Sequence, residues 1–366
     1  MIIPPLDARS RVMMIAPHPD DESLAAGVLL QRAVTAGGAV RIIYATDGDD
    51  NPWPQRALEK RWRLAAVDRV RWGKRRRQEA LSALGKLSIP PTSARFLGLP
   101  DQGLTRVLLH DGQTTAWRIA ALIKAWAPTH LLFPSEMDSH PDHSALALLT
   151  RFALEEISAT DKGFALLTYL VHGPHARFAV DATALNQTMV ETITKRSAIA
   201  EHRTQIKLSR RRFMSYARRP ECFGGSVTHF GRHRTCAAFR SAEKLRIVFR
   251  FPLNSLGRGQ LHLLLVGRIR VGGPFAVSLQ LPERDASVQI TEVATGHRHG
   301  LAAFRGNARG GTILLSALSF APDRPIWAKI SRRRCFLERA GWEQIAAVSR
   351  VENTKSKSAK DHLVAA

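Results

Sequence analysis

The chain has 366 residues, of which 45% are hydrophobic, so the composition excludes a disordered or fibrous protein and allows two folded domains. Its 54 Lys and Arg residues outnumber its 31 Asp and Glu residues, which gives a formal net charge of +23. That excess favours anionic partners, or it marks a basic solvated surface with no dedicated partner. The sequence offers no apolar run of about 18 residues and no signal-peptide pattern near its start, so we expect a cytoplasmic protein without a transmembrane segment.

The first 50 residues alternate between strand-like and helix-like patterns. Residues 11–16 and 40–46 are apolar runs, and residues 21–36 between them carry apolar side chains at helical spacing before Gly37 and Gly38. Strand, helix and strand in this order predict the parallel sheet of an α/β fold. The alternation continues, and it predicts strands at 94–99, 129–134 and 164–173 and helices at 55–87 (interrupted near Gly73), 116–126, 143–157 and 184–206.

The pattern changes after residue 206. Residues 209–220 are basic and poorly periodic, and from residue 245 short β-like runs are separated by Gly, Pro, Asn and Asp. We therefore expect an α/β domain over residues 1–240, a β-rich accessory domain over 241–349 with a possible sandwich, and a disordered tail at 350–366. Trp327 and Trp342 in the second domain could stack on sugar rings or pack in its core.

The segment IAPHPDDESL (15–24) places polar groups where the first strand ends and a helix begins. A hydrolytic zinc site needs about three His, Asp, Glu or Cys ligands, an open position for water and a nearby base. His18 and Asp21 are candidate ligands, and Asp20 between them is a candidate base. The alternative for each acidic residue is a favourable interaction with the positive end of the helix.

A second segment, MDSHPDHSA (137–145), offers the missing ligand. It also follows a predicted strand and also begins a helix, and sites in open α/β sheets lie beyond the carboxyl ends of the strands. His140 and His143 are three residues apart, so either could reach a metal held by the first segment. Two His-Pro-Asp elements at two such junctions are hard to explain as unrelated helix caps.

PHPDDE followed downstream by HPDH resembles the LmbE-like or PIG-L family of zinc-dependent N-acetylglucosaminyl deacetylases. Further matching segments are TDGD (46–49), Arg76 with Glu79, FLGLPDQGL (96–104) and the spacing from Lys195 to Gln205, so the resemblance covers about residues 10–240. It implies a Rossmann-like, LmbE-type parallel sheet flanked by helices and removal of an acetyl group from an N-acetyl-hexosamine.

The resemblance assigns roles to individual residues. His18, Asp21 and His143 would bind Zn²⁺, for which Fe²⁺ or Co²⁺ could substitute in such a ligand set. Asp20 would be the general base, and His140 would stabilise the oxyanion and assist the leaving amine.

Four further residues receive supporting roles from the resemblance. Arg76 and Asp101 would contact the sugar, although Arg76 could instead lie on a solvated helix face and Asp101 in a turn. Glu22 and Asp142 would orient ligands or catalytic histidines by hydrogen bonds. The position two before His140 supplies a catalytic tyrosine in some members of the family and is Asp138 here.

Other functions stay open on the sequence alone. The substrate could contain another amide, as in an amino-sugar antibiotic or a thiol-cofactor precursor. A non-catalytic protein that binds an anionic glycan or nucleic acid is a third reading, although the chain carries no recognised nucleic-acid motif. The expected partner is a small sugar or glycoconjugate, which the net charge suggests is acidic, and the sequence sets no oligomeric state.

Overall fold

The computed structural model describes residues 3–157, 163–173, 182–225, 236–241, 243–250, 261–270, 272–307, 310–317, 320–332, 338 and 341–348. It divides into two compact units, one of residues 1–108 with 114–231 and the other of residues 109–113 with 232–366. The tail at 350–366, expected to be disordered, lies outside the described residues. The domain limits expected from the sequence stay a prediction.

The first unit is built on a seven-stranded sheet. Its strand order is β3-β2-β1-β4-β5-β7-β6, in which the first five strands are parallel and β7 and β6 pair antiparallel at one edge. The predicted parallel sheet is confirmed. The strands are β1 (Arg11–Ala16), β2 (Ala39–Thr46), β3 (Ala94–Leu99), β4 (His130–Pro134), β5 (Ala165–Tyr169), β6 (Thr183–Leu185) and β7 (Glu221–Gly224).

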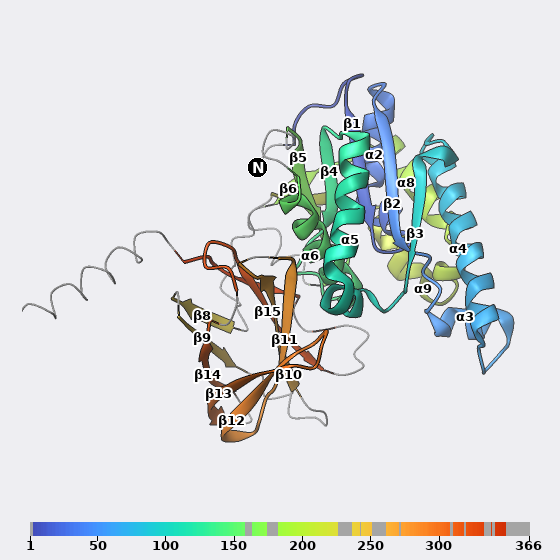
Figure 1. Cartoon of the computed structure of the whole chain (residues 1–366). Helices are drawn as coiled ribbons and strands as arrows, with labels where there is room; N and C mark the ends of the chain where they lie inside the picture. Colours follow the sequence, from blue (N-terminus) through green and yellow to red (C-terminus); the bar gives the residue numbers. More distant parts are fainter. Residues whose placement is uncertain are drawn as a thin grey trace, which may run out of the picture. The chain divides into compact units, whose positions relative to one another are not determined.

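Helices flank this sheet, and in Figure 1 α5 lies in front of it and α8 behind it. They are α1 (Asp21–Ala25), α2 (Gly27–Thr35), α3 (Pro52–Glu59), α4 (Ala66–Lys86), α5 (Leu104–Trp126), α6 (Pro141–Glu155), α8 (Met189–Glu201) and α9 (Arg203–Tyr216), with a 3-10 turn η1 (Pro91–Ser93) before β3. Among the described residues, no helix is both long and hydrophobic enough to cross a bilayer.

The predicted helix at 55–87 is wrong in its limits. The chain forms two helices, α3 and α4, and the break between them follows Lys60, whose backbone is left-handed at φ 52°. Gly73, where an interruption was expected, lies inside α4. A Cβ there would come within 3.1 Å of the Cβ atoms of Asp47 and Asp49, so this glycine permits close packing rather than ending the helix.

Two other predicted helices also differ from the structure. The helix expected at 116–126 begins earlier, at Leu104, because Gly103 and the preceding turn start α5. The helix expected at 184–206 is replaced by β6, α8 and α9, and a capping box at Thr188 and Glu191 starts α8. The basic segment judged poorly periodic forms the second half of α9, whose backbone is non-helical at Ser209.

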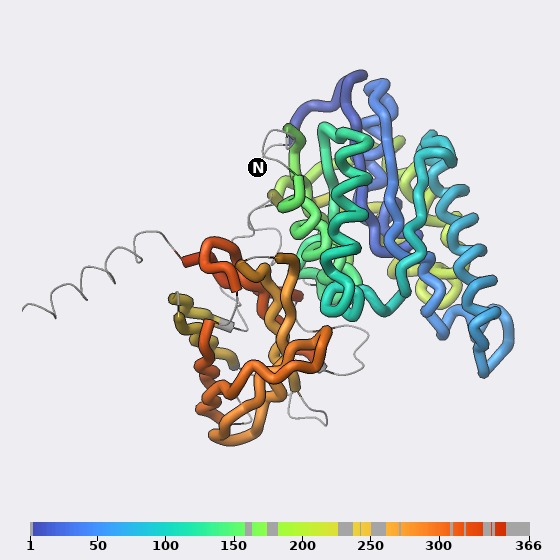
Figure 2. The backbone as a smooth tube through the Cα atoms, in the orientation of Figure 1, coloured from blue at the N-terminus to red at the C-terminus, as the bar shows by residue number. Residues whose placement is uncertain are grey.

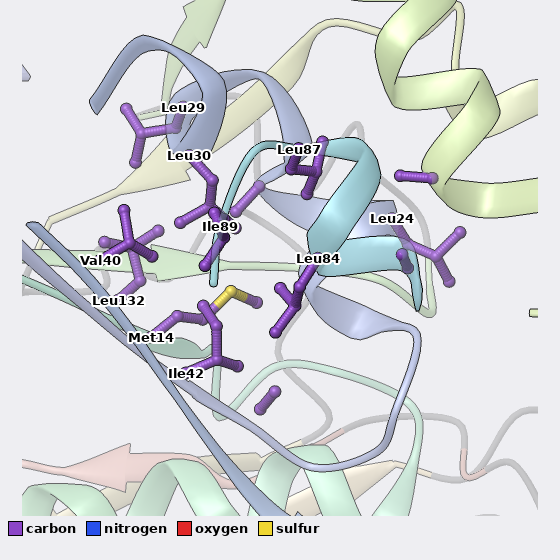
Figure 3. Close-up of a cluster of buried hydrophobic side chains, with 14 of the residues drawn as sticks. Met14, Leu24, Leu29, Leu30, Val40, Ile42, Leu84, Leu87, Ile89 and Leu132 are labelled. Atoms are coloured by element: carbon purple, nitrogen blue, oxygen red, sulfur yellow. The ribbon is translucent and has the colours of Figure 1, made fainter. Parts of the chain in front are cut away.

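Alternating side chains of the central strands are buried on both faces of the sheet. Met14 on β1 and Ile42 on β2 join Leu29 and Leu84 from the covering helices in one apolar cluster (Figure 3). Met13, the neighbour of Met14, is also fully buried. Burial on both faces explains why these strands are almost continuously apolar in sequence.

The topology places two loops side by side. β1 and β4 are parallel neighbours, with Val12 opposite His130 and Met14 opposite Leu132. From β1 the chain continues to β2 on one side, and from β4 it continues to β5 on the other. The carboxyl ends of β1 and β4 therefore lie side by side where the strand order reverses, which is the usual ligand position in open α/β sheets.

The second unit is a curled antiparallel sheet, whose chain folds back from strand to strand (Figure 2). The strand order is β16-β15-β10-β11-β12-β13-β14-β9-β8, and the two edge strands contact each other. Trp327 and Trp342 are 3% and 0% exposed, so both belong to the core of this unit. The strands are β8 (Cys236–Arg240), β9 (Lys244–Arg250), β10 (Leu261–Arg268), β11 (Pro274–Gln280), β12 (Arg284–Glu292), β13 (Arg298–Asn307), β14 (Gly310–Ser316), β15 (Ile326–Arg332) and β16 (Glu343–Ile345).

Candidate metal centre

The loop after β1 has a strained backbone at the residue expected to be the base. Asp20 has φ 149° and ψ −25°, which is unusual for a residue with a side chain. Its N–H donates to Glu22 Oε2 at 3.0 Å, and its carbonyl accepts from the N–H groups of Ser23 and Leu24 at the start of α1. These bonds hold Asp20 and Asp21 in a fixed orientation beyond the strand.

Three expected ligands meet at this point, with one donor atom from each. His18 Nδ1 lies 3.5 Å from Asp21 Oδ2, His143 Nε2 lies 3.4 Å from the same oxygen, and the two nitrogens are 3.3 Å apart. All three residues are buried. His18 and Asp21 follow β1, whereas His143 lies in the first turn of α6 after β4.

The spacing of these atoms suits one small divalent cation. Nitrogen and oxygen ligands bind zinc at about 2.0–2.2 Å, and tetrahedral coordination at such lengths separates the ligand atoms by about 3.3–3.5 Å. Without a cation, an acidic oxygen and two imidazole nitrogens would converge in a buried space. The residues present therefore fit a zinc-type metal.

Carboxylates orient His18 from its other side. Its Nε2 lies 3.2 Å from Asp101 Oδ1 and 3.2 Å from Asp142 Oδ2. Asp142 is itself fixed, because it accepts hydrogen bonds from the backbone N–H groups of Gln102 and Leu104. A proton on Nε2 leaves the Nδ1 lone pair directed at the ligand cluster.

Asp138 supports His143 in the same manner. Its Oδ2 lies 3.2 Å from His143 Nδ1, and both side chains are 0% exposed. The same carboxylate accepts from the backbone N–H groups of His140, Val171 and His172. The position that the resemblance assigns to a tyrosine in some family members thus holds a carboxylate that contacts His143, a candidate ligand.

Asp20 lies beside the ligand cluster and is paired with Arg76. Arg76 Nη2 donates to Asp20 Oδ2 at 3.0 Å, and Arg76 also donates to the carbonyl oxygens of Pro19 and Gly48. Burial raises the pKa of Asp20 to about 6, against the lowering effect of Arg76. For Asp21, burial also raises the pKa, but the His143 and His18 imidazoles outweigh it and bring the pKa well below its usual range.

His140 caps α6 and faces the ligands. Its Nδ1 accepts a hydrogen bond from the backbone N–H of Asp142 at 3.2 Å, and Pro141 follows at the first helical position. In the neutral ring this leaves the proton on Nε2. The ring centroid lies 4.8 Å from that of His18 and 5.1 Å from that of His143, so His140 adjoins the ligand cluster.

Glu22 lies beneath the loop and contacts a histidine from a distant part of the chain. His202 Nε2 lies 2.9 Å from Glu22 Oε1, and Ser23 Oγ donates to the same oxygen. Burial raises the pKa of Glu22, but the His202 imidazole and the hydrogen bond from Ser23 together outweigh burial, so the pKa is lowered. Glu22 therefore links His202 to the backbone of Asp20.

Sequence reasoning missed the roles of Asp138, His172 and His202. The His172 ring lies 4.8 Å from that of His143 and 5.3 Å from that of His140. His172 follows β5, the strand next to β4, so its position at a third strand end was the available signal. His202 lies in the matching segment from Lys195 to Gln205, but it is 180 residues from Glu22 and nothing local predicts their contact.

The fold and the site define an α/β protein with a buried cluster of His and Asp side chains at the sheet's switch point, and this cluster could hold a metal ion. Residues 13–154 match the PIG-L family, described as GlcNAc-PI de-N-acetylase. This match confirms the family resemblance expected from the paired motifs, and it includes every expected site residue.

Among curated proteins, the chain is similar to 1D-myo-inositol 2-acetamido-2-deoxy-alpha-D-glucopyranoside deacetylase of Mycobacterium avium. The two are 27% identical over 147 residues, which represent 36% of this chain and 47% of that protein. The chain thus spans about half the length of the curated relatives it matches.

Solved structures with a similar fold include the A40926 pseudoaglycone deacetylase Dbv21, at 20% identity and a TM-score of 0.46, covering 61% of this chain and 99% of that one. N,N'-diacetylchitobiose deacetylase from Pyrococcus horikoshii is 19% identical, with a TM-score of 0.44 and coverage of 58% and 82%.

Proposed function

We propose that the chain is a metal-dependent deacetylase that hydrolyses the acetamido group of an N-acetylglucosamine-type sugar. The observation that carries the proposal is the convergence of His18 Nδ1, Asp21 Oδ2 and His143 Nε2, with the buried carboxylate of Asp20 beside them. The family match over residues 13–154 supports the reaction class, and the relatives that remove acetyl groups from amino sugars support the substrate class.

His18, Asp21 and His143 would hold the metal, with zinc as the expected ion and Fe²⁺ or Co²⁺ as substitutes. A bound divalent metal supplies Lewis acidity, which lowers the pKa of water and polarises a carbonyl oxygen. Asp101, Asp142 and Asp138 keep the two imidazoles in the orientation and tautomer that direct a lone pair inward.

Asp20 acts as the general base. Its carboxylate is outside the ligand set, and Arg76 fixes its orientation. A base whose pKa burial raises to about 6 is mostly ionised near neutral pH, yet basic enough to accept a proton from the attacking water. The proton then passes to the amide nitrogen, so that acetate and a free amine leave.

His140 assists at the opposite side of the amide. The proton on its Nε2 can be donated to the oxyanion or to the departing nitrogen. Its Nδ1 is occupied by the backbone N–H of Asp142, which fixes the ring. Arg76 donates a hydrogen bond to Asp20, and Asp101 contacts His18, so both side chains already have protein partners inside the site. Their contacts with the sugar stay predictions.

Acetate release tests the proposal. Metal-loaded wild type and the Asp20→Asn variant are compared on a panel of N-acetylglucosamine conjugates and on acetamides without a sugar. We expect release from the sugar conjugates that falls at least about 100-fold in the variant. Cleavage confined to acetamides without a sugar would contradict the substrate class, and equal rates for both proteins would contradict the mechanism.

A further inference from the structure

A pocket on α9, beside the candidate metal centre, is lined by exposed arginines. It has a volume of about 540 Å³, and it is formed where the backbone of α9 departs from helical geometry at Ser209. The residues that line it are Leu208, Ser209, Arg210, Arg211, Arg212, Ser215 and Arg219.

These arginines lack acidic neighbours. Residues 203–219 contain seven Lys and Arg residues and no Asp or Glu. Among the described residues, no carboxylate lies within ion-pair distance of Arg210, Arg211, Arg212 or Arg219. Four guanidinium groups around one pocket repel each other, and an anion between them relieves that repulsion. Guanidinium groups bind phosphate and carboxylate oxygens with paired donors.

The pocket connects to the candidate metal centre through one side chain. Arg212 Nη2 lies 3.0 Å from His172 Nδ1. The His172 ring in turn lies 4.8 Å from the ring of His143 and 5.3 Å from that of His140. Two side-chain contacts, from His140 to His172 and from His172 to Arg212, therefore connect the expected position of the substrate amide to the arginine pocket.

We propose that the α9 pocket binds an anionic group, phosphate or carboxylate, of the acetylated substrate, so that the enzyme prefers acidic sugar conjugates. The inference rests on the proposed deacetylase function. The geometry of the pocket favours a substrate group over nucleic acid as its ligand. The arginines surround a local pocket that contacts His172 of the candidate metal centre, and they do not form an extended stripe with stacking aromatic side chains.

The test uses Arg210→Gln/Arg211→Gln and, as matched control, Arg218→Gln, an exposed arginine of the same segment outside the pocket. The kcat/KM is measured on N-acetylglucosamine, its 6-phosphate and N-acetylglucosaminuronic acid. We expect wild type to prefer an acidic sugar, and the double variant to lose at least about tenfold of that preference through KM. The control retains it. A wild type without preference, or a preference that survives the double variant, would overturn the proposal.

Binding separates this inference from the proposed function. Calorimetry with the Asp20→Asn background measures affinity for the same three sugars without turnover. Wild type could release no acetate and yet bind an acidic sugar more tightly than N-acetylglucosamine, with that difference lost in the double variant. This result would contradict the proposed function but support the anion-binding pocket. If a DNA oligonucleotide, rather than any acidic sugar, loses affinity in the double variant, the pocket is a nucleic-acid contact and the inference is wrong.

Discussion

Arg76 Nη2 lies 3.0 Å from Asp20 Oδ2, and both residues are buried beside the candidate metal ligands. A residue that resembles a sugar contact in sequence thus holds the carboxylate assigned as the base. We expect Arg76→Gln to lower kcat about 10- to 100-fold, because a base displaced by a fraction of an ångström transfers protons poorly. Steady-state kinetics check this: a raised KM with unchanged kcat would instead assign Arg76 to substrate binding.

Gly48 offers an independent way to move Arg76. Its carbonyl accepts from Arg76 Nη1, its φ is 63°, and an added Cβ would overlap the guanidinium. We expect Gly48→Ala to lower kcat as Arg76→Gln does. Gly85→Ala, on α4 with no atom near the added Cβ, is the control and should leave kcat unchanged.

The contact between Asp138 and His143 predicts an effect on metal affinity. Asp138→Asn removes the charged acceptor 3.2 Å from His143 Nδ1, so the imidazole becomes a weaker ligand. We expect zinc affinity to fall about 10- to 100-fold, measured by competition with a fluorescent chelator. Asp7→Asn, an exposed aspartate near the start of the chain, should bind zinc as wild type does. Unchanged affinity in Asp138→Asn would contradict the assigned role.

Glu221 stabilises the first unit from inside. It pairs with Lys195 Nζ at 2.7 Å and accepts from the backbone N–H groups of Val28 and Leu29, with both charged side chains 1% exposed. Glu221→Gln leaves the buried lysine charge without an opposite charge, so we expect a loss of about 3–5 kcal/mol in the free energy of unfolding. Urea titration measures it, and a loss under 1 kcal/mol would refute the assignment.

Glu191 predicts a pH dependence of stability. The hydrogen bond from Arg32 lowers its pKa from 4.5 to about 2. A carboxylate whose pKa is lower in the folded state than in the unfolded state stabilises the protein at pH values above the unfolded-state pKa. This stabilisation is lost as the pH falls through the folded-state pKa. Because the pair is partly exposed, we expect Glu191→Gln to cost at most about 1 kcal/mol at pH 7. The difference from wild type should disappear between about pH 4.5 and 2, and a constant difference in urea titrations would contradict this.

The sequence predicted which side chains lie together better than it predicted the limits of the helices around them. The proximity of His18, Asp21 and His143 could be predicted because two short motifs follow two strands whose carboxyl ends share one edge of the sheet. Their binding of a metal stays a prediction. The break between α3 and α4 was missed because the sequence signal at Gly73 reflects packing against Asp47 and Asp49, not an end of a helix. The support from Asp138 depends on long-range folding of the loops and has no local pattern.

Metal content and acetate release, measured on the same preparations, test the central claim most directly. We predict one metal ion per chain in wild type and in Asp20→Asn, with acetate release by wild type alone, and loss of both metal and activity in His143→Ala. If His143→Ala binds the ion as tightly as wild type, or if Asp20→Asn releases acetate at the wild-type rate, the assignment of ligands and base is wrong.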